Sequence, residues 1–210
     1  VEEALTVSAT FSSLKESITL LTERCHVSTF TEIIEDLIGR PERLQKILRK
    51  RNETTYYGLE EIFGCHQAEK SEDSIKLFHE LQKERALDLQ NASGCLMEGG
   101  KTDIARGEAI QAWVALKEVP TLEDFNSYAS HFLTIEGDIR KTLVSVGVSQ
   151  NYPSILEYLM KEAHLLWEVV QKQKSLFNMK MTKALYDLGA AILENYECQK
   201  VAQHSLDYND

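Results

Sequence analysis

Histidine and glutamate are the side chains of this sequence from which metal chemistry would be built. A di-iron site in a helical bundle uses two Glu-x-x-His motifs and two further glutamates, all facing the bundle interior. The sequence has one such spacing, from Glu23 to His26, at the end of a predicted helix, and Glu162-Ala163-His164 is one residue too short. No second motif completes either set, so we expect no metal site and no cofactor.

Catalytic motifs are also absent from the sequence. Paired carboxylates occur at Glu60-Glu61, Glu72-Asp73 and Glu123-Asp124. The last two pairs lie at predicted helix starts, where the helix dipole favours acidic side chains without any catalytic role. Gly-rich phosphate loops, the G-x-S-x-G elbow and H-E-x-x-H are not found. Cys25 and His26 are adjacent, and so diverge by about 100° on a helix. The sequence therefore favours a non-enzymatic function over an enzyme.

The charge balance is acidic, with one local exception. The sequence has 23 Lys and Arg residues and 33 Asp and Glu residues, which gives a net charge of -10. This balance argues against nucleic-acid binding, because contacts with phosphates need clustered Lys and Arg side chains. Arg40–Arg51, however, holds six basic residues and a single acid, with Arg43, Lys46 and Lys50 on one helical face. We predict that this face binds an acidic protein partner or an anionic lipid surface. The alternative is a solvated face paired with acids elsewhere in the bundle.

The C-terminal fifty residues contain the longest helical pattern. Apolar residues keep helical phase from Ile155 to about Gln203 without a proline. Met179 and Tyr186 share one face of this helix, and Phe177 and Met181 share another. A helix that is apolar on two faces is either central in its bundle or buried in a second interface. We predict Met179 and Tyr186 as partner-binding residues, with a homodimer among the candidate assemblies.

These residues must be positioned by helices, because apolar residues recur throughout at spacings of three and four. We predict an all-α fold of six or seven helices in a bundle with a long C-terminal helix. Either the bundle is elongated, or the last helix breaks near Gln171–Asn178. Residues 1–210 are expected to form one domain, with a flexible acidic tail from about residue 205. The predicted helices are about Glu2–Cys25, Phe30–Ile38, Pro41–His66, Ser71 to Gly99, Lys101–Glu118, a helix capped by Thr121 that reaches Val146, and the last helix.

The cysteines and the hydropathy of the sequence indicate in which cellular compartment the protein is expected. The four cysteines are evenly spread with no C-x-x-C pair, and each lies in or near a helical apolar stripe. Free buried thiols are favoured over two disulfides. The longest uncharged run, Leu143–Leu156, is shorter than the roughly 20 apolar residues that span a membrane. We expect a cytoplasmic protein.

The function that these patterns favour is a helical interaction module, an adaptor or scaffold that binds a protein partner through helix faces. Two alternatives remain open. One is a membrane-associated helical module that uses the basic segment 40–51. The other is a bundle that holds a small apolar ligand or a metal between its helices.

Overall fold

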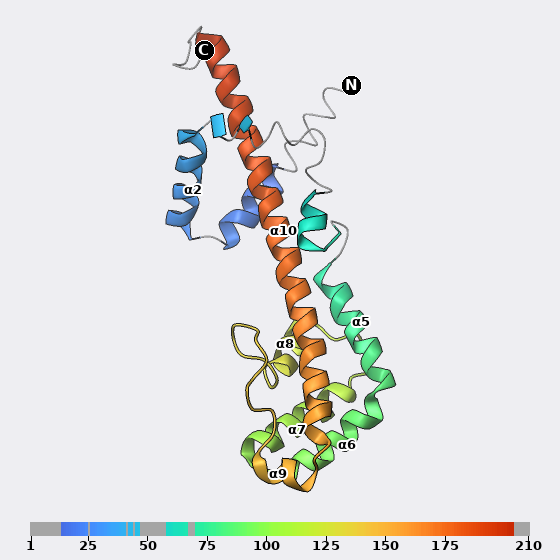
Figure 1. Ribbon diagram of the computed structural model, residues 1–210. Helices are drawn as coiled ribbons and strands as arrows, with labels where there is room; N and C mark the ends of the chain where they lie inside the picture. Colours follow the sequence, from blue (N-terminus) through green and yellow to red (C-terminus); the bar gives the residue numbers. More distant parts are fainter. Residues whose placement is uncertain are drawn as a thin grey trace. The chain divides into compact units, whose positions relative to one another are not determined.

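The computed structural model describes residues 14–24, 26–40, 42–43, 45–46, 58–66 and 70–203, and these ranges contain helices and no β-strand (Figure 1). The predicted all-α fold with a long C-terminal helix is confirmed. Residues 14–24 and 58–63 are also helical. The labelled helices are α2 (Val27–Gly39), α5 (Ser71–Glu84), α6 (Ala86–Leu96), α7 (Lys101–Val114), α8 (Leu122–Ala129), α9 (Val146–Asn151) and α10 (Ile155–Gln203).

The contacts of the chain divide it into two compact units. One unit comprises Val1–Gln67 with Phe177–Asp210, and the other comprises Ala68–Leu176. Helix α10 contributes to both units and is helical throughout Gln171–Asn178, where a break was one of the predicted alternatives. The prediction of one domain over residues 1–210 stays a prediction. The tail from about residue 205 lies outside the described residues.

The first unit has a small apolar core. Leu21, Ala184 and Leu188 are its buried members, and Phe30 and Ile34 of α2 pack against them. Helix α2 begins at Val27, three residues before the predicted Phe30. His26 is the N-cap residue, and its Nδ1 accepts a hydrogen bond from the backbone N–H of Ser28 at 3.4 Å. An imidazole nitrogen thus takes the place of the usual hydroxyl or carboxylate oxygen.

The second unit has a larger core, built around aromatic side chains. The Trp113 and Tyr128 rings stack at 4.7 Å between centroids, and Phe125 meets Phe78 edge to face at 5.7 Å. Phe132 packs against Tyr128 at 5.3 Å. These rings come from α5, α7, α8 and the segment after α8, so they join four parts of the chain. Aromatic pairs of this geometry stabilise a core beyond the area that they bury.

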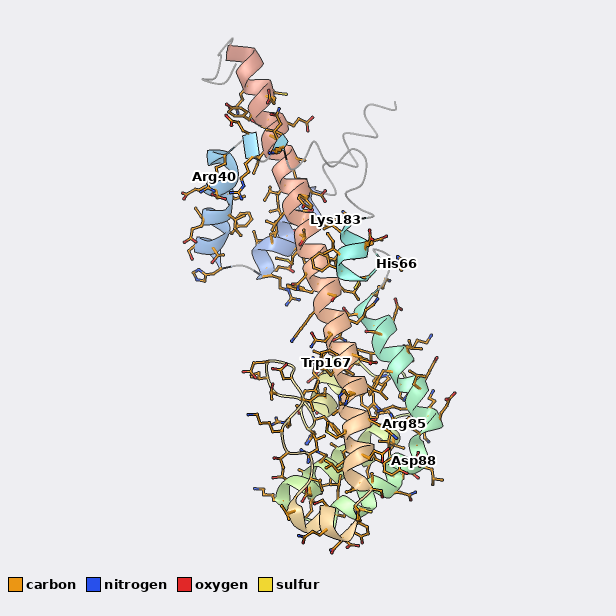
Figure 2. The ribbon with its side chains drawn as sticks, in the orientation of Figure 1. Arg40, His66, Arg85, Asp88, Trp167 and Lys183 are labelled. Atoms are coloured by element: carbon orange, nitrogen blue, oxygen red, sulfur yellow. The ribbon has the colours of Figure 1, made fainter. Side chains whose placement is uncertain are left out.

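The helix predicted from Ser71 to Gly99 is wrong in its continuity. The chain turns at Arg85, which is labelled in Figure 2 and has φ -105° and ψ 6°, so that α5 and α6 are separate helices. The turn allows Gln82 and Arg85 to reach the same buried carboxylate, as described below. At its start, Lys70 is the N-cap residue of α5 and Ser71 is the first helical residue, as predicted. The Asp73 carboxylate accepts a hydrogen bond from the Lys70 backbone N–H at 3.0 Å.

The predicted cap at Thr121 is confirmed. Its hydroxyl accepts a hydrogen bond from the Asp124 backbone N–H at 3.2 Å, and the Asp124 carboxylate accepts from the Thr121 backbone N–H at 2.9 Å. This reciprocal capping box begins α8. The helix ends at Ala129, however, so its predicted extension to Val146 is wrong.

Residues 132–140 form a small hairpin in place of the predicted helix. The Arg140 backbone N–H donates a hydrogen bond to the Phe132 carbonyl oxygen at 2.9 Å, and the Thr134 backbone N–H donates to the Asp138 carbonyl oxygen at 2.7 Å. Gly137 closes the turn with φ 86°, a conformation that side chains with a Cβ rarely adopt. Ile135, which the helical pattern placed in the core, lies at the tip and is 97% exposed.

Two buried side chains of α7 hold this irregular segment. Arg106 donates to the backbone carbonyls of His131, at 2.9 Å, and of Leu143. Asp103 accepts a hydrogen bond from the Ser145 backbone N–H at 3.1 Å. Backbone groups that a helix would have paired internally are thus paired with side chains.

The end of α7 also differs from the prediction. α7 ends at Val114, short of the predicted Glu118, and residues 115–121 connect it to α8. The short helix α9 is absent from the predicted helices, and its Val148 side chain is buried in the core.

Candidate binding groove and buried polar cluster

A groove of about 480 Å³ lies between α5 and the N-terminal half of α10, within the second unit. Its apolar lining comes from both helices. The residues of this lining are Leu77, Phe78, Leu81, Leu165 and Val169. We call this feature the α5–α10 groove.

The apolar residues of α5 fall on two faces. Ile75 and Phe78 point into the core and are buried. Leu77 and Leu81, four residues apart, lie on the other face and are 59% and 45% exposed. Two leucines one helical turn apart form a continuous apolar strip, whereas a single exposed leucine on a protein surface is unremarkable. This strip forms the outer wall of the α5–α10 groove.

Charged residues flank the groove in a defined order. Gln82, near the C-terminal end of α5, bonds Glu162 near the N-terminal end of α10, so the two helices run antiparallel. Lys70 and Lys172 therefore lie at the same end of the groove, where they add positive charge. Asp73 and Glu168 follow one turn further along the two helices. The groove thus offers an apolar floor, a cationic end and an acidic pair next to it.

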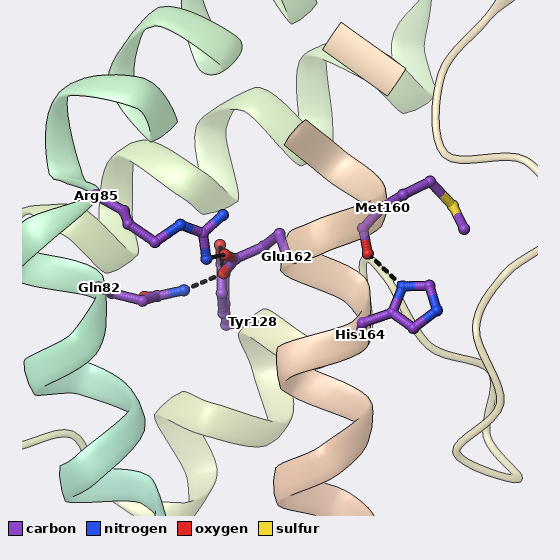
Figure 3. Close-up of polar contacts among 6 residues, drawn as sticks. All are labelled: Gln82, Arg85, Tyr128, Met160, Glu162 and His164. Carbon is purple, nitrogen blue, oxygen red and sulfur yellow. Dashed lines mark hydrogen bonds and ion pairs between the residues drawn. The ribbon is translucent and has the colours of Figure 1, made fainter. Parts of the chain in front are cut away.

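A buried polar cluster fixes α5 against α10 beyond the other end of the groove (Figure 3). Glu162 is fully buried and accepts hydrogen bonds from three donors. The Tyr128 hydroxyl donates to Oε1 at 2.8 Å, and the Gln82 amide donates to the same oxygen. Arg85 Nη1 lies 3.1 Å from Oε2. Gln82 belongs to α5, Arg85 to the α5–α6 turn and Tyr128 to α8. The Glu162 carboxylate therefore connects these three parts of the unit to α10.

The electrostatics of the cluster reflect its burial. Loss of solvent raises the pKa of Glu162, even though Tyr128, Arg85 and Gln82 all favour the ionised form. Burial and the neighbouring carboxylate also raise the pKa of the Tyr128 hydroxyl. His164, two residues along α10, points away from the cluster, and its Nδ1 lies 2.7 Å from Met160 O (Figure 3). The buried carboxylate therefore holds α5, the α5–α6 turn and α8 against α10.

A second buried group lies near the cluster. His79 packs edge to face on Trp113 with 6.0 Å between ring centroids. Burial lowers the pKa of His79, and Lys83 adds to that effect. The two rings line a cavity of about 40 Å³, too small for a ligand much larger than a few water molecules. Among the residues that the structure describes, no group of three or more His, Cys, Asp or Glu side chains could hold a metal ion.

The predicted partner-binding residues fall in the first unit. Arg43 and Lys46 are exposed, and Lys50 lies outside the described residues. Met179 is buried, with 4% exposure, and Tyr186 is half-buried. Their binding roles stay predictions. On the other predicted face, Phe177 is exposed beneath the Arg24 guanidinium, and Met181 packs against the Leu21 core.

Sequence reasoning missed the groove and the cluster, although both leave a signal. Glu162 lies in phase with Leu159 and Leu166, three residues after one and four before the other, which predicts a glutamate facing the core. Leu77 and Leu81 repeat at i and i+4 beside the core stripe of Ile75 and Phe78. A second stripe on a helix with a complete first stripe indicates a second apolar contact.

Comparisons with protein-family models, with curated proteins and with solved structures yield no match for this chain. None of the described helices is both long enough and apolar enough to cross a membrane. Cys65, Cys95 and Cys198 carry free thiols, but of these three only Cys65 is buried as predicted; Cys95 is half-buried and Cys198 is exposed. Cys25 lies outside the described residues.

Proposed function

We propose that this protein is a non-enzymatic helical interaction module, an adaptor or scaffold that binds a protein partner through helix faces. The observation that carries the proposal is the α5–α10 groove, whose floor is apolar and whose outer wall is made of two exposed leucines. Most single exposed apolar residues need no explanation, but an apolar groove bordered by charged residues is typical of a surface that receives a helix.

The chemistry of the groove defines its occupant as an amphipathic helix. Lys70 to Leu81 spans eleven positions, or about 16 Å, which is the length of three helical turns. An occupant of that length presents apolar residues at i, i+3 or i+4, and i+7 to the floor. An acidic residue of the occupant would lie beside Lys70 and Lys172, and a basic one beside Asp73 and Glu168.

The basic face of Arg43, Lys46 and Lys50 and the half-buried Tyr186 belong to the same proposal as further contact surfaces, whereas the Met179 side chain is buried and offers little surface to a partner. They lie on a different unit from the groove. Their contributions can therefore be measured separately by substitution.

A photo-crosslinking amino acid at position 77 tests the groove directly. The matched control carries the same amino acid at position 87, because Leu87 is exposed at 70% on α6 but does not line the groove. Both variants are irradiated in an extract of cells that produce the protein, and the crosslinked peptides are identified by mass spectrometry. We expect an adduct from position 77 alone, on a segment with apolar residues at helical spacing.

Two results would contradict the proposal. The first is equal adduct formation from positions 77 and 87, which would make the groove no more reactive than ordinary surface. The second is an adduct on position 77 that maps to segments without apolar helical spacing. Leu81→Asp, which charges the groove wall, should suppress the position-77 adduct if a helix occupies the groove.

A further inference from the structure

The outer face of α5 bears a charge pattern that is complementary to itself. Lys70 caps the helix, Leu77 and Leu81 follow, and Glu84 is the last helical residue. Spacings of seven, four and three place these four residues on one stripe of the helix. All four are exposed. The stripe is cationic at its N-terminal end, apolar in the middle and anionic at its C-terminal end.

Such a stripe matches a second copy of itself when the two run antiparallel. With Leu77 on a two-fold axis, Lys70 lies seven residues to one side and Glu84 seven residues to the other. Lys70 of one copy therefore faces Glu84 of the second copy, and the same contact is repeated by symmetry. The two Leu77 side chains meet at the centre, where each stripe borders the α5–α10 groove, and Leu81 of each copy lies opposite Asp73 and Ser74 of the other.

We propose that the helix received by the α5–α10 groove is α5 of a second copy of this chain, paired antiparallel about a two-fold axis near Leu77. This inference rests on the proposed function and names the partner of the same surface. The cationic end of the groove supports it, because Lys70 lies there and receives the anionic C-terminal end of the other α5, at Glu84.

The charge pair cannot form within one chain. Lys70 and Glu84 are fourteen residues apart along a single helix, a separation of about 21 Å. That distance exceeds the reach of an ion pair, which requires oxygen and nitrogen within about 4 Å. Any coupling measured between these two positions must therefore act between two copies.

The oligomeric state of the full chain is the first test. Sedimentation equilibrium over a hundredfold range of concentration should show a mass that rises from 23.9 kDa toward twice that value. Leu77→Asp places two carboxylates at the centre of the pair and should hold the protein at the monomer mass. Leu87→Asp makes the same change on a leucine of α6 that is 70% exposed, against 59% for Leu77, and should leave the association unchanged.

A charge exchange is the second and sharper test. Lys70→Glu alone should weaken the dimer about tenfold, because two favourable contacts become repulsive. Glu84→Lys alone should do the same. The double variant Lys70→Glu/Glu84→Lys restores opposite charges between copies and should return the dissociation constant to near its original value. Lys76→Glu, an exposed lysine of α5 off the stripe, serves as the control and should not be rescued by Glu84→Lys.

The outcomes separate this inference from the proposed function. A protein that stays monomeric at all concentrations overturns the self-pairing of α5. A dimer that survives Leu77→Asp, or whose charge variants show no rescue, overturns it as well, since the copies then meet elsewhere. In either case an adduct from position 77 on an amphipathic helix of another protein would still support the proposed function.

Discussion

Replacing Glu162 by alanine tests whether the buried polar cluster stabilises the second unit. The substitution leaves the Tyr128 hydroxyl and the Gln82 amide buried without an acceptor. It also removes the partner of Arg85, whose side chain is 24% exposed and can recover solvent. We expect the free energy of unfolding to fall by about 3 kcal/mol.

The magnitude follows from the burial of each donor. A buried donor left without a partner costs about 1–3 kcal/mol. Two such donors, Tyr128 and Gln82, give about 4 kcal/mol, and Arg85 adds little because water reaches it. The cost of burying the carboxylate itself disappears with the substitution and offsets part of this loss. The balance is about 3 kcal/mol, which for a chain of this length corresponds to a Tm lower by about 6–12 °C.

Tryptophan fluorescence in urea is the appropriate assay. The sequence has two tryptophans, Trp113 and Trp167, and both belong to the second unit, so their emission reports on the unit that contains the cluster. The control is Glu157→Ala, an exposed glutamate of the same helix that pairs with Lys161 at 2.7 Å. Solvent screens that pair, so the urea midpoint of the control should match the original protein.

A Glu162→Ala variant with the stability of the original protein would refute the reasoning. It would mean that the desolvation cost of the carboxylate equals the value of its three hydrogen bonds. A Tyr128→Phe variant distinguishes the contributions, because it removes one donor and leaves the carboxylate in place. We expect that variant to lose about 1 kcal/mol.

Three other measurements address the loops, the caps and the pH dependence. Gly137→Ala forces a Cβ into a left-handed backbone position, 2.8 Å from Lys174 Nζ, and should cost about 1–2 kcal/mol in urea unfolding; an unchanged midpoint would contradict the hairpin geometry. Thr121→Ala removes the hydroxyl of the capping box and should cost about 1 kcal/mol by the same assay, with rescue by Thr121→Ser. Burial raises the pKa of Glu162 above its unfolded value, so the native state binds the proton more tightly. The original protein should therefore lose stability relative to the Glu162→Gln variant as the pH rises toward neutrality from about 4.3, the ordinary pKa of glutamate. A difference in unfolding free energy between the two proteins that stays constant with pH would contradict the raised pKa of Glu162.

Helical periodicity predicted the fold class and most helix locations, because the apolar residues of a partly buried helix recur at spacings of three and four along the sequence. The capping box at Thr121 was visible for the same reason, since both of its partners are local. The sequence did not decide whether α10 is continuous, because the stretch Gln171–Asn178 has too few apolar residues to continue the apolar stripe clearly. Helix propensity across that stretch is sufficient without a continuous apolar face.

The hairpin at residues 132–140 shows where periodicity misleads. Phe125, Phe132 and Ile139 recur at multiples of a helical repeat, but Gly137 favours a turn and Ile135 faces solvent. No Gly or Pro marks the turn at Arg85 in the sequence, and the carboxylate that its side chain binds lies 77 residues further along the chain. The groove depends on the antiparallel packing of α5 on α10, which no local pattern encodes.

The role of Arg106 constrains how this sequence can vary. In isolation, position 106 is an ordinary helix site at which leucine or glutamine has nearly the same helix propensity as arginine. In the folded chain, its guanidinium supports backbone carbonyls at both ends of the segment between α8 and α9. A substitution that suits the helix would release a distant connection, so a variant library should tolerate far fewer residues at position 106 than helix preference allows. Lysine would fail too, because a single ammonium group cannot reproduce the planar fork that reaches two separate carbonyls.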